Sequence, residues 1–336
     1  MPDPLLEVRD LHVSFVTEDG VVKAVDGVSF SVFPGESLGV VGESGSGKSV
    51  TFLTVMGLLR AEQADITGEI LYRGQALLSM PSDVLRSIRG SKISMIFQDP
   101  LTSLHPFYRV GDQIAEMITR HEGVSKKEAF DRAVDMLDLV KIAQPDRRAK
   151  QYPHEFSGGM RQRAMIAMAL ALNPDLLIAD EPTTALDVTV QAQILDLIEA
   201  LKHEFDAAVA IVTHDLGVVA EHCETIQVMY AGKVVETGRT DDIYYRSEHP
   251  YTWGLLSSIP KLGVEEDRLT PIKGLPPSLI HVPSGCAFHP RCPYVFDRCK
   301  TDVPELLPSD GMHAAACHLG LADKQRIFSE EILTSR

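Results

Sequence analysis

Eight residues near the start of the chain have the spacing that binds the phosphates of a nucleotide. Gly42–Ser49 reads GESGSGKS and fits the pattern G-x-x-x-x-G-K-[ST]. An apolar run at 37–41, typical of a buried strand, precedes it, and a helix-like run at 50–59 follows it. Glycines let backbone N–H groups turn toward an anion, and a helix start adds partial positive charge. Lys48 supplies a point charge, and the Ser49 hydroxyl can ligate Mg²⁺. The loop residues expected to hold the phosphates are Gly42, Ser44, Gly45, Gly47, Lys48 and Ser49.

A second group of residues suits chemistry at the terminal phosphate. The strand-like run 176–181 ends in two adjacent carboxylates, Asp180 and Glu181. Asp180 can hold Mg²⁺ directly or through water, and Glu181 can accept the proton of the water that attacks the γ-phosphate. Adjacent carboxylates repel one another, so a purely structural reason for this pair at a buried strand end is weak. We therefore expect a magnesium ligand at Asp180 and a catalytic base at Glu181.

Three more side chains could complete such a site, although each also has a structural explanation. Gln98 follows the buried strand 92–97, where it could contact Mg²⁺ or the attacking water, or simply begin a loop. His214 follows the strand 208–213 and could reach the γ-phosphate, while a lone histidine is usually structural. Phe15, at the end of a strand, could stack on adenine or fill the core. The residues by themselves leave these alternatives open.

Two predicted helices start with capping residues, and one of these starts could also face an anion. Ser157–Gly159 opens a helix predicted at 160–172, and such a start presents backbone N–H groups to a phosphate. Asp187 precedes a helix predicted at 188–204 and is a plausible N-cap. Many helices begin in this way, so neither signal is specific by itself.

Strand and helix signals alternate along the chain and predict an α/β fold. The first third carries strand-like runs separated by a hairpin-type turn at 18–20. Helical spacing at 110–121 and 126–140 predicts a helical insertion, about residues 100–160, between two strands of the core. Further strands are predicted at 5–15, 21–25, 28–33, 67–74, 225–230 and 233–237.

Length, charge and hydropathy exclude several classes of protein. The 336 residues carry a formal net charge of −15, which argues against a sequence-independent nucleic-acid binder and against adhesion to anionic lipid. There is no apolar run near 18 residues, and the start, MPDPLLEVRD, has no features of a signal peptide. These observations predict a cytoplasmic protein with no nucleic-acid partner.

Four of the five cysteines gather near the end of the chain. They are separated by five, six and seventeen residues, a spacing without the C-x-x-C pairs common in zinc sites. Four thiolates in a proline-rich segment suggest a metal that staples it, and both zinc and a [4Fe–4S] cluster suit such ligands. Disulfides are disfavoured in a reducing cytoplasm. The four are Cys286, Cys292, Cys299 and Cys317, while Cys223 is read as a small buried side chain.

In this order, the motifs resemble those of the ATP-binding subunits of ABC transporters over about residues 5–240. The phosphate loop resembles the Walker A motif, and Asp180 and Glu181 resemble the Walker B aspartate and catalytic glutamate. Phe15, Gln98 and His214 resemble the adenine-stacking aromatic, the Q-loop and the switch histidine. The family signature usually reads LSGGQ, and residues 156–160 read FSGGM here. The matching signature residues are Ser157, Gly158 and Gly159, and Ala185, Leu186 and Asp187 resemble the D-loop.

The resemblance implies an ATPase that works as a head-to-tail pair. Ser157 and its glycines would cover an ATP held by the partner's phosphate loop. ATP binding would close the pair, and hydrolysis would release it. The insertion and the Gln98 loop would pass this motion to two membrane permease subunits. The implied cofactors are ATP and Mg²⁺, with Ser49, Gln98 and Asp180 as magnesium ligands.

The end of the chain narrows the type of transporter. Residues 249–252 (HPYT), 274–277 (GLPP) and 285–293 (GCAFHPRCP) resemble the extension of oligopeptide and dipeptide importer ATPases. We therefore divide the chain into an ABC-type ATP-binding domain, 1–240, and a C-terminal extension, 241–336. At the cysteines, the resemblance favours the [4Fe–4S] cluster over zinc.

This subfamily resemblance also implies partners and a location. It implies peptide import powered from the cytoplasmic side of the inner membrane, a different chain as second ATPase subunit, and an extracytoplasmic peptide-binding protein. Two other readings stay open. One is an importer ATPase for another cargo, such as a metal chelate or a glutathione-like compound. The other is a soluble ABC ATPase outside transport.

Overall fold

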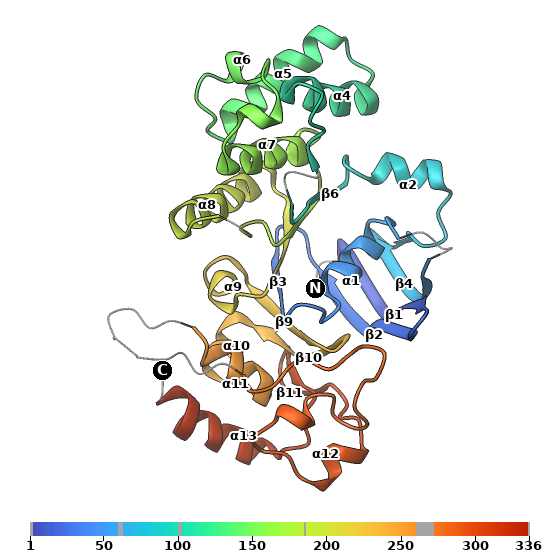
Figure 1. Cartoon of the computed structure of the whole chain (residues 1–336), viewed down its shortest axis with the longest axis vertical. Helices are drawn as coiled ribbons and strands as arrows, with labels where there is room; N and C mark the ends of the chain where they lie inside the picture. Colours follow the sequence, from blue (N-terminus) through green and yellow to red (C-terminus); the bar gives the residue numbers. More distant parts are fainter. Residues whose placement is uncertain (1–2, 60–62, 100–102, 185, 260–271, 335–336) are drawn as a thin grey trace. The chain divides into compact units, whose positions relative to one another are not determined.

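The computed structural model describes residues 3–59, 63–99, 103–184, 186–259 and 272–334 (Figure 1). The chain forms two compact units. Unit 1 comprises Met1–Leu5, Val32–Glu36 and Tyr72–Val212, and unit 2 comprises Leu6–Ser31, Ser37–Leu71 and Thr213–Arg336. In the described part of the chain, no helix is both long and apolar enough to cross a bilayer.

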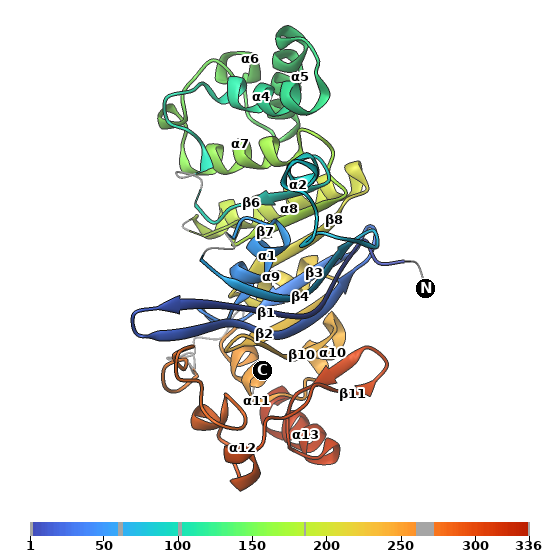
Figure 2. The same ribbon diagram turned by 90° about the vertical axis from the view of Figure 1, so that its right-hand side faces the viewer.

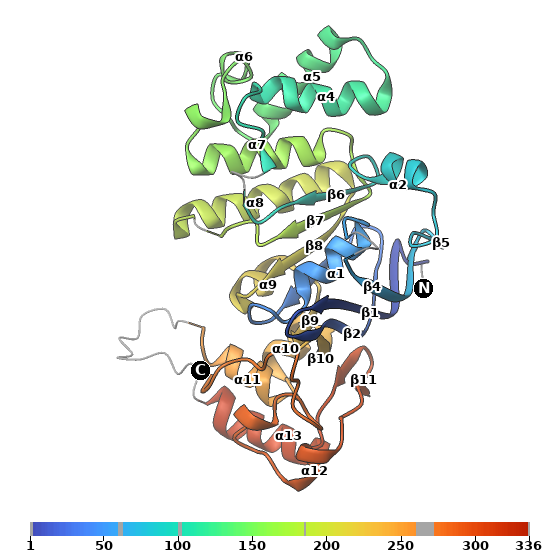
Figure 3. The same cartoon turned by 45° about the vertical axis from the view of Figure 1, so that its right-hand side comes forward.

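The core of unit 1 is a set of parallel strands. β7 (Leu176–Asp180) pairs with β6 (Ile93–Ile96) and with β8 (Ala208–Thr213), and every residue of the three strands is buried (Figure 3). Continuous apolar runs of this kind are typical of parallel strands that are covered on both faces. Ile96 is in register with Ala179, so the residues that follow β6 and β7 lie at the same edge of the sheet.

Helices of the predicted insertion pack together in unit 1 (Figure 1). α4 (Val110–Glu122) buries Ile114 and Ile118, and α5 (Lys126–Leu139) buries Ala129, Ala133 and Leu137, each at a spacing of four residues. α7 (Gly158–Leu170) contacts both helices, β6 and α8 (Val188–Phe205). The two predicted insertion helices are thus present. Among the residues described, unit 1 also contains β5 (Gln75–Ala76), α2 (Ser82–Ile88), α6 (Pro145–Arg148) and the 3₁₀ turn η1 (Pro153–Glu155).

Unit 2 begins with the predicted hairpin (Figure 2). β1 (Leu6–Thr17) neighbours β2 (Gly20–Val32) on one side and β4 (Asp65–Tyr72) on the other. The two strands predicted at 21–25 and 28–33 are one strand, β2. Gly27 has φ 81°, which lets the strand continue through a conformation that other residues adopt rarely.

The second sheet of unit 2 is mixed. β3 (Ser37–Val41) runs parallel to β9 (Thr225–Tyr230), and β9 pairs antiparallel with β10 (Lys233–Arg239). β12 (His313–Ala315) pairs with β10, and β11 (Leu307–Asp310) pairs with β12. Residues from the end of the chain therefore continue the sheet that carries the phosphate loop.

Helices of unit 2 cover this sheet and build the C-terminal part. α1 (Lys48–Val55) ends earlier than the predicted 50–59, and Gly57 follows in the left-handed region with φ 58°. α9 (Leu216–His222) contacts β3, and α10 (Thr240–Tyr245) contacts β9 and β10. The other elements are α11 (Pro250–Leu256), the 3₁₀ turn η2 (His289–Arg291), α12 (Asp297–Thr301), α13 (Leu321–Ile327) and the π-helical turn η3 (Phe328–Leu333).

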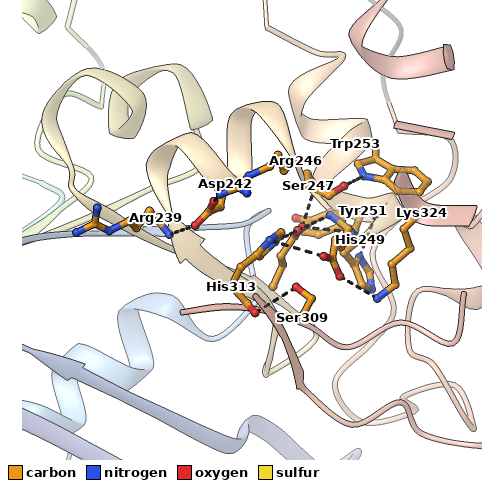
Figure 4. A network of polar contacts seen from close by, with 12 residues as sticks. Arg239, Asp242, Arg246, Ser247, His249, Tyr251, Trp253, Ser309, His313 and Lys324 are labelled. Carbon is orange, nitrogen blue, oxygen red and sulfur yellow. Dashed lines mark hydrogen bonds and ion pairs between the residues drawn. The ribbon is translucent and has the colours of Figure 1, made fainter. Parts of the chain in front are cut away.

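A buried carboxylate joins the C-terminal residues to strand β10. Glu236 is fully buried and accepts hydrogen bonds from the Ser247 hydroxyl at 2.9 Å and from the N–H groups of residues 248 and 249. His313 Nε2 lies 2.9 Å from the same carboxylate (Figure 4). Burial lowers the pKa of His313, but the hydrogen bond to Glu236 and nearby carboxylates outweigh it, so the pKa is raised.

Candidate functional site

The phosphate loop of unit 2 requires glycine at two positions for steric reasons. A Cβ at Gly42 would lie 2.2 Å from the Met229 carbonyl oxygen, and one at Gly47 would lie 2.3 Å from that of Ala24. Gly47 also has φ 102°, immediately before helix α1. Side chains at either position would force the loop away from the neighbouring strands. The GESGSGKS spacing therefore has a structural cause in this fold.

Lys48 and Ser46 place polar groups inside this loop. The Lys48 side chain is buried, and its Nζ donates to the carbonyls of Gly42 at 2.6 Å and Glu43 at 3.0 Å. The Ser46 hydroxyl is buried and, among the described residues, has no hydrogen-bond partner. A buried donor without a partner is costly, and an anion's oxygen would satisfy it. The loop is therefore suited to a phosphate.

A cavity of about 330 Å³ lies beside the loop in unit 2. Residues 43–46 of the loop form one part of its lining, and residues 276–280, from the predicted extension, form another. The Leu279 carbonyl accepts a hydrogen bond from the Lys23 N–H at 3.2 Å, which attaches this segment to β2. The predicted extension thus contributes directly to the surroundings of the phosphate loop.

Phe15 and His214 also lie in unit 2. Phe15 is part of β1, near its end, and its side chain is partly exposed. His214 directly follows β8 and is exposed.

Gln98 and Glu181 are brought together in unit 1. Gln98 Nε2 donates to Glu181 Oε2 at 3.0 Å, and the Thr184 hydroxyl donates to the same oxygen at 2.7 Å. Glu181 lies just beyond β7 with φ 46°, an unusual conformation for a residue with a long side chain. Asp180, the last residue of β7, is buried. Two donors therefore fix the orientation of the Glu181 carboxylate.

Sequence reasoning missed the part played by Thr184. It lies three residues beyond Glu181, so an ST-type contact back to that carboxylate was available as a signal.

The signature residues open helix α7 of unit 1. The exposed Ser157 is its N-cap and accepts a hydrogen bond from the Met160 N–H at 3.3 Å. A Cβ at Gly158 would meet the Leu186 side chain at 3.8 Å, and one at Gly159 would meet Val190 at 3.1 Å. Gly158 is exposed and Gly159 is half-buried.

The D-loop is described only in part. Asp187 caps α8, accepting from the Val190 N–H at 3.0 Å. Ala185 lies outside the described residues.

The four predicted cysteines line one small cavity of unit 2, of about 20 Å³, which we call the cysteine cavity. Burial raises the pKa of Cys292 to about 12 and that of Cys317 to about 11, and it also raises the pKa of Cys286. His289, His318 and Phe288 complete part of the lining. Among the residues described, no group of three or more histidine, cysteine, aspartate or glutamate side chains is arranged to hold a metal ion.

The predicted site residues therefore fall into two groups. One group, in unit 1, is Gln98, Glu181 and Asp180, which share one sheet edge. Helix α7, which carries the signature residues, also belongs to unit 1. The phosphate loop, Phe15, His214 and the cysteines belong to unit 2.

Comparison with known proteins identifies the class. Residues 25–184 match the ABC transporter family, and residues 235–299 match the oligopeptide/dipeptide transporter C-terminal region. Among solved structures, the chain is similar to the ATP-binding cassette MJ0796 bound to ADP and Pi, with a TM-score of 0.63 and 28% identity. That similarity covers 70% of this chain and 98% of the other.

Curated relatives define the type more narrowly. Over 300 residues the chain is 53% identical to the oligopeptide transport ATP-binding protein OppD of Salmonella typhimurium, covering 89% of each chain. It is 51% identical to the dipeptide transport ATP-binding protein DppD of Bacillus subtilis, covering 94% of this chain and 95% of the other. The chain belongs to the ABC transporter ATPases, in the family of oligopeptide and dipeptide transport ATP-binding proteins.

Proposed function

We propose that this chain hydrolyses ATP to power the import of peptides through an ABC transporter, working at the cytoplasmic side of the inner membrane. Its partners are a second ATPase subunit, of a different sequence, and two membrane permease subunits. An extracytoplasmic binding protein delivers the peptide. The observation that carries the proposal is the high identity to peptide transport ATP-binding proteins along nearly the whole chain, including the C-terminal region.

The phosphate loop holds the triphosphate in this proposal. The N–H groups of Ser44, Gly45 and Gly47 face the phosphates, and Lys48 neutralises their charge. Phe15 stacks on the adenine, and His214 contacts the γ-phosphate. Ser49, Gln98 and Asp180 would hold Mg²⁺, which would offset the charge that develops on the phosphate oxygens.

Glu181 acts as the general base. Its carboxylate accepts a proton from the water that attacks the γ-phosphate. The hydrogen bonds from Gln98 and Thr184 support this role, because both donate to one carboxylate oxygen and so hold the carboxylate in one orientation. A base held in one orientation loses less entropy as the transition state forms.

The signature residues act on the partner subunit's nucleotide. Ser157, Gly158 and Gly159 open a helix whose N-terminus suits an anion. The proposal places that helix start over the ATP bound by the second subunit. Contacts made only in the closed pair allow ATP to favour closure, and hydrolysis removes them.

Co-purification with membrane subunits tests this function. The chain, tagged and extracted in mild detergent, should retain two hydrophobic permease subunits and a second ATPase chain. ATP hydrolysis by that complex should rise when a peptide-loaded binding protein is added. A complex stimulated by a metal chelate and not by peptides would favour the alternative cargo. Isolation of the chain without any membrane subunit would support the soluble ATPase reading.

We further propose that Cys286, Cys292, Cys299 and Cys317 hold a [4Fe–4S] cluster. Four thiols facing one cavity form a soft donor set that suits iron–sulfur clusters. Zinc needs its ligands close around one ion, with Zn–S distances of about 2.3 Å. Cys286, Cys292, Cys299 and Cys317 would hold the cluster, which would supply a covalent staple and a redox centre.

Metal analysis distinguishes the two candidates. Protein purified without oxygen should contain about four irons and four labile sulfides per chain, with broad visible absorption. A Cys299→Ser variant should lose them, whereas Cys223→Ser should keep them because Cys223 does not line the cavity. Colourless protein with one equivalent of zinc would contradict the cluster.

A further inference from the structure

One residue of the phosphate loop is held by side chains from the end of the sequence. Glu43 is the second residue of the GESGSGKS loop, and its carboxylate receives two hydrogen bonds from Arg291, at 2.6 and 3.0 Å. Its backbone N–H donates to the Tyr251 hydroxyl at 2.8 Å. Its backbone carbonyl accepts from Lys48 Nζ at 3.0 Å. The three polar parts of Glu43 are therefore all fixed, two of them by the predicted extension.

Arg291 is itself immobilised. Only 5% of its side chain is exposed, and the guanidinium also donates to the Lys273 carbonyl at 3.1 Å. It lies 5.8 Å from the ring centre of Tyr230 and 6.0 Å from that of Phe288. A planar guanidinium that makes a two-point contact with a carboxylate defines distance and angle together. A lysine at this position could not reproduce that geometry.

Arg291 also lies within the cysteine loop, residues 286–292. It is the last residue of η2 and directly precedes Cys292. The His289 N–H donates to the Cys286 carbonyl at 2.9 Å, and the Arg291 N–H donates to the Phe288 carbonyl at 3.0 Å. These short-range bonds make a compact turn, so a movement of either cysteine displaces the guanidinium.

We propose that Arg291 is a positioning residue for the phosphate loop, and that it makes nucleotide affinity depend on the conformation of the cysteine loop. The loop's N–H groups bind phosphate only when the backbone is turned toward it, and Glu43 is the residue at which that turn begins. Arg291 fixes Glu43 from outside the loop. Arg291 is not among the described residues that line the cavity beside the loop. The coupling needs ordered cysteines and does not depend on which metal they bind.

Substitution of the arginine tests the first part. We expect Arg291→Met to raise the Kd for Mg·ATP roughly tenfold or more, measured with a fluorescent ATP analogue on the full chain. Hydrogen exchange should quicken in residues 42–49. Arg291→Lys should recover only part of the affinity, and kcat at saturating ATP should change less than twofold. Arg298→Met, on α12 of the same region, is the matched control, because the Arg298 side chain is exposed and pairs with Asp302.

A double-mutant cycle separates positioning from general destabilisation. Glu43→Gln is the milder partner variant and should also weaken ATP binding. If the pair acts as a unit, Arg291→Met combined with Glu43→Gln should weaken binding little more than either change alone. Effects that multiply would overturn the proposal, as would unchanged affinity and unchanged loop protection in Arg291→Met.

The cysteine loop tests the second part. Cys292→Ser should raise the Kd for Mg·ATP in the same direction as Arg291→Met, and it should have little further effect in the Arg291→Met background. Cys223→Ser is the control, since that thiol lies outside the cysteine cavity. Normal affinity and normal exchange of residues 42–49 in Cys292→Ser would overturn the link between the cysteine loop and the phosphate loop.

Discussion

At the scale of single residues, Glu181 combines an uncommon backbone conformation with a fixed side chain. Its φ of 46° costs free energy, and such strain is retained where the surroundings impose it, often at functional sites. Gln98 and Thr184 both donate to one of its oxygens. The strand end thus presents a carboxylate in one orientation, which suits a base that must meet a single water molecule.

Glu181→Gln tests this role directly. The amide has the shape of the carboxylate but cannot accept the proton, so ATP hydrolysis should fall by at least ~100-fold while ATP binding persists. Steady-state phosphate release and equilibrium nucleotide binding measure the two effects. Glu204→Gln, an exposed change on α8, is the control and should leave both unchanged. Hydrolysis at the normal rate in Glu181→Gln would remove Glu181 as the base.

His249 gives a prediction about pH. Burial lowers its pKa to about 3, and its Nδ1 accepts a hydrogen bond from the Tyr251 N–H at 3.1 Å. The unfolded chain therefore binds a proton below about pH 6.5 that the folded chain does not bind. The contribution of His249 to the free energy of unfolding should be fully present above pH 6.5. It should fall as the pH drops toward 3, by up to about 1.4 kcal/mol per pH unit.

The comparison with His249→Asn isolates this effect. Asparagine can keep the cap on α11 but does not titrate. Urea unfolding between pH 7 and 5 should show a shallower dependence on pH in the variant than in the natural chain. Equal slopes would show that His249 is not buried in its neutral form.

At the scale of elements, the sequence predicted what depends on local pattern. Continuous apolar runs identified β3, β6, β7 and β8, because strands covered on both faces have no polar alternation. The prediction missed α2, a short helix in which no residue is buried. The predicted interruption between residues 25 and 28 does not occur. Gly27 adopts a positive φ of 81°, and β2 continues through it.

Contacts between residues that are far apart in the sequence could not be predicted from the sequence. Arg291 and Glu43 are 248 positions apart, and no sequence pattern around either residue predicts a buried ion pair. The gathering of the four cysteines was predicted because four of the five cysteines fall within residues 286–317. Tyr251, Trp253 and Phe328 of the extension are buried. The ring contact between Trp253 and Phe328 joins residues far apart in the sequence.

The attachment of the C-terminal region to β10 depends on Glu236. Glu236→Gln keeps the size of the side chain but removes the charge that faces His313 and the acceptor for one of the N–H groups. We expect this change to lower the free energy of unfolding by about 3 kcal/mol. The buried groups that pair with the carboxylate would then have no charged partner. Hydrogen exchange should quicken in residues 307–324 and not in α4 and α5 of unit 1.

An exposed carboxylate of the same region provides the control. Asp310→Asn breaks an ion pair with Arg246 in which both side chains are exposed, and it should cost less than 1 kcal/mol. If Glu236→Gln were as mild as Asp310→Asn, the buried carboxylate would not be what holds β12 to β10.

At the scale of the whole molecule, the chain supplies half of an ATP-driven machine. In the proposed mechanism, the phosphate loop and the signature residues serve two different nucleotides in a head-to-tail pair, so one chain alone completes neither site. ATP binding would then favour association of the two subunits, and hydrolysis would return them to the open state. Residues 276–280 and Arg291 of the extension lie beside the phosphate loop, outside the motifs.

Peptide uptake by the reconstituted transporter tests the central claim most directly. The complete complex in liposomes, with ATP inside and labelled peptide bound to its binding protein outside, should accumulate peptide only while ATP is hydrolysed. The same complex carrying Glu181→Gln should bind ATP but accumulate no peptide. Uptake that continues in the Glu181→Gln complex, or steady hydrolysis without movement of any peptide tested, would contradict the account.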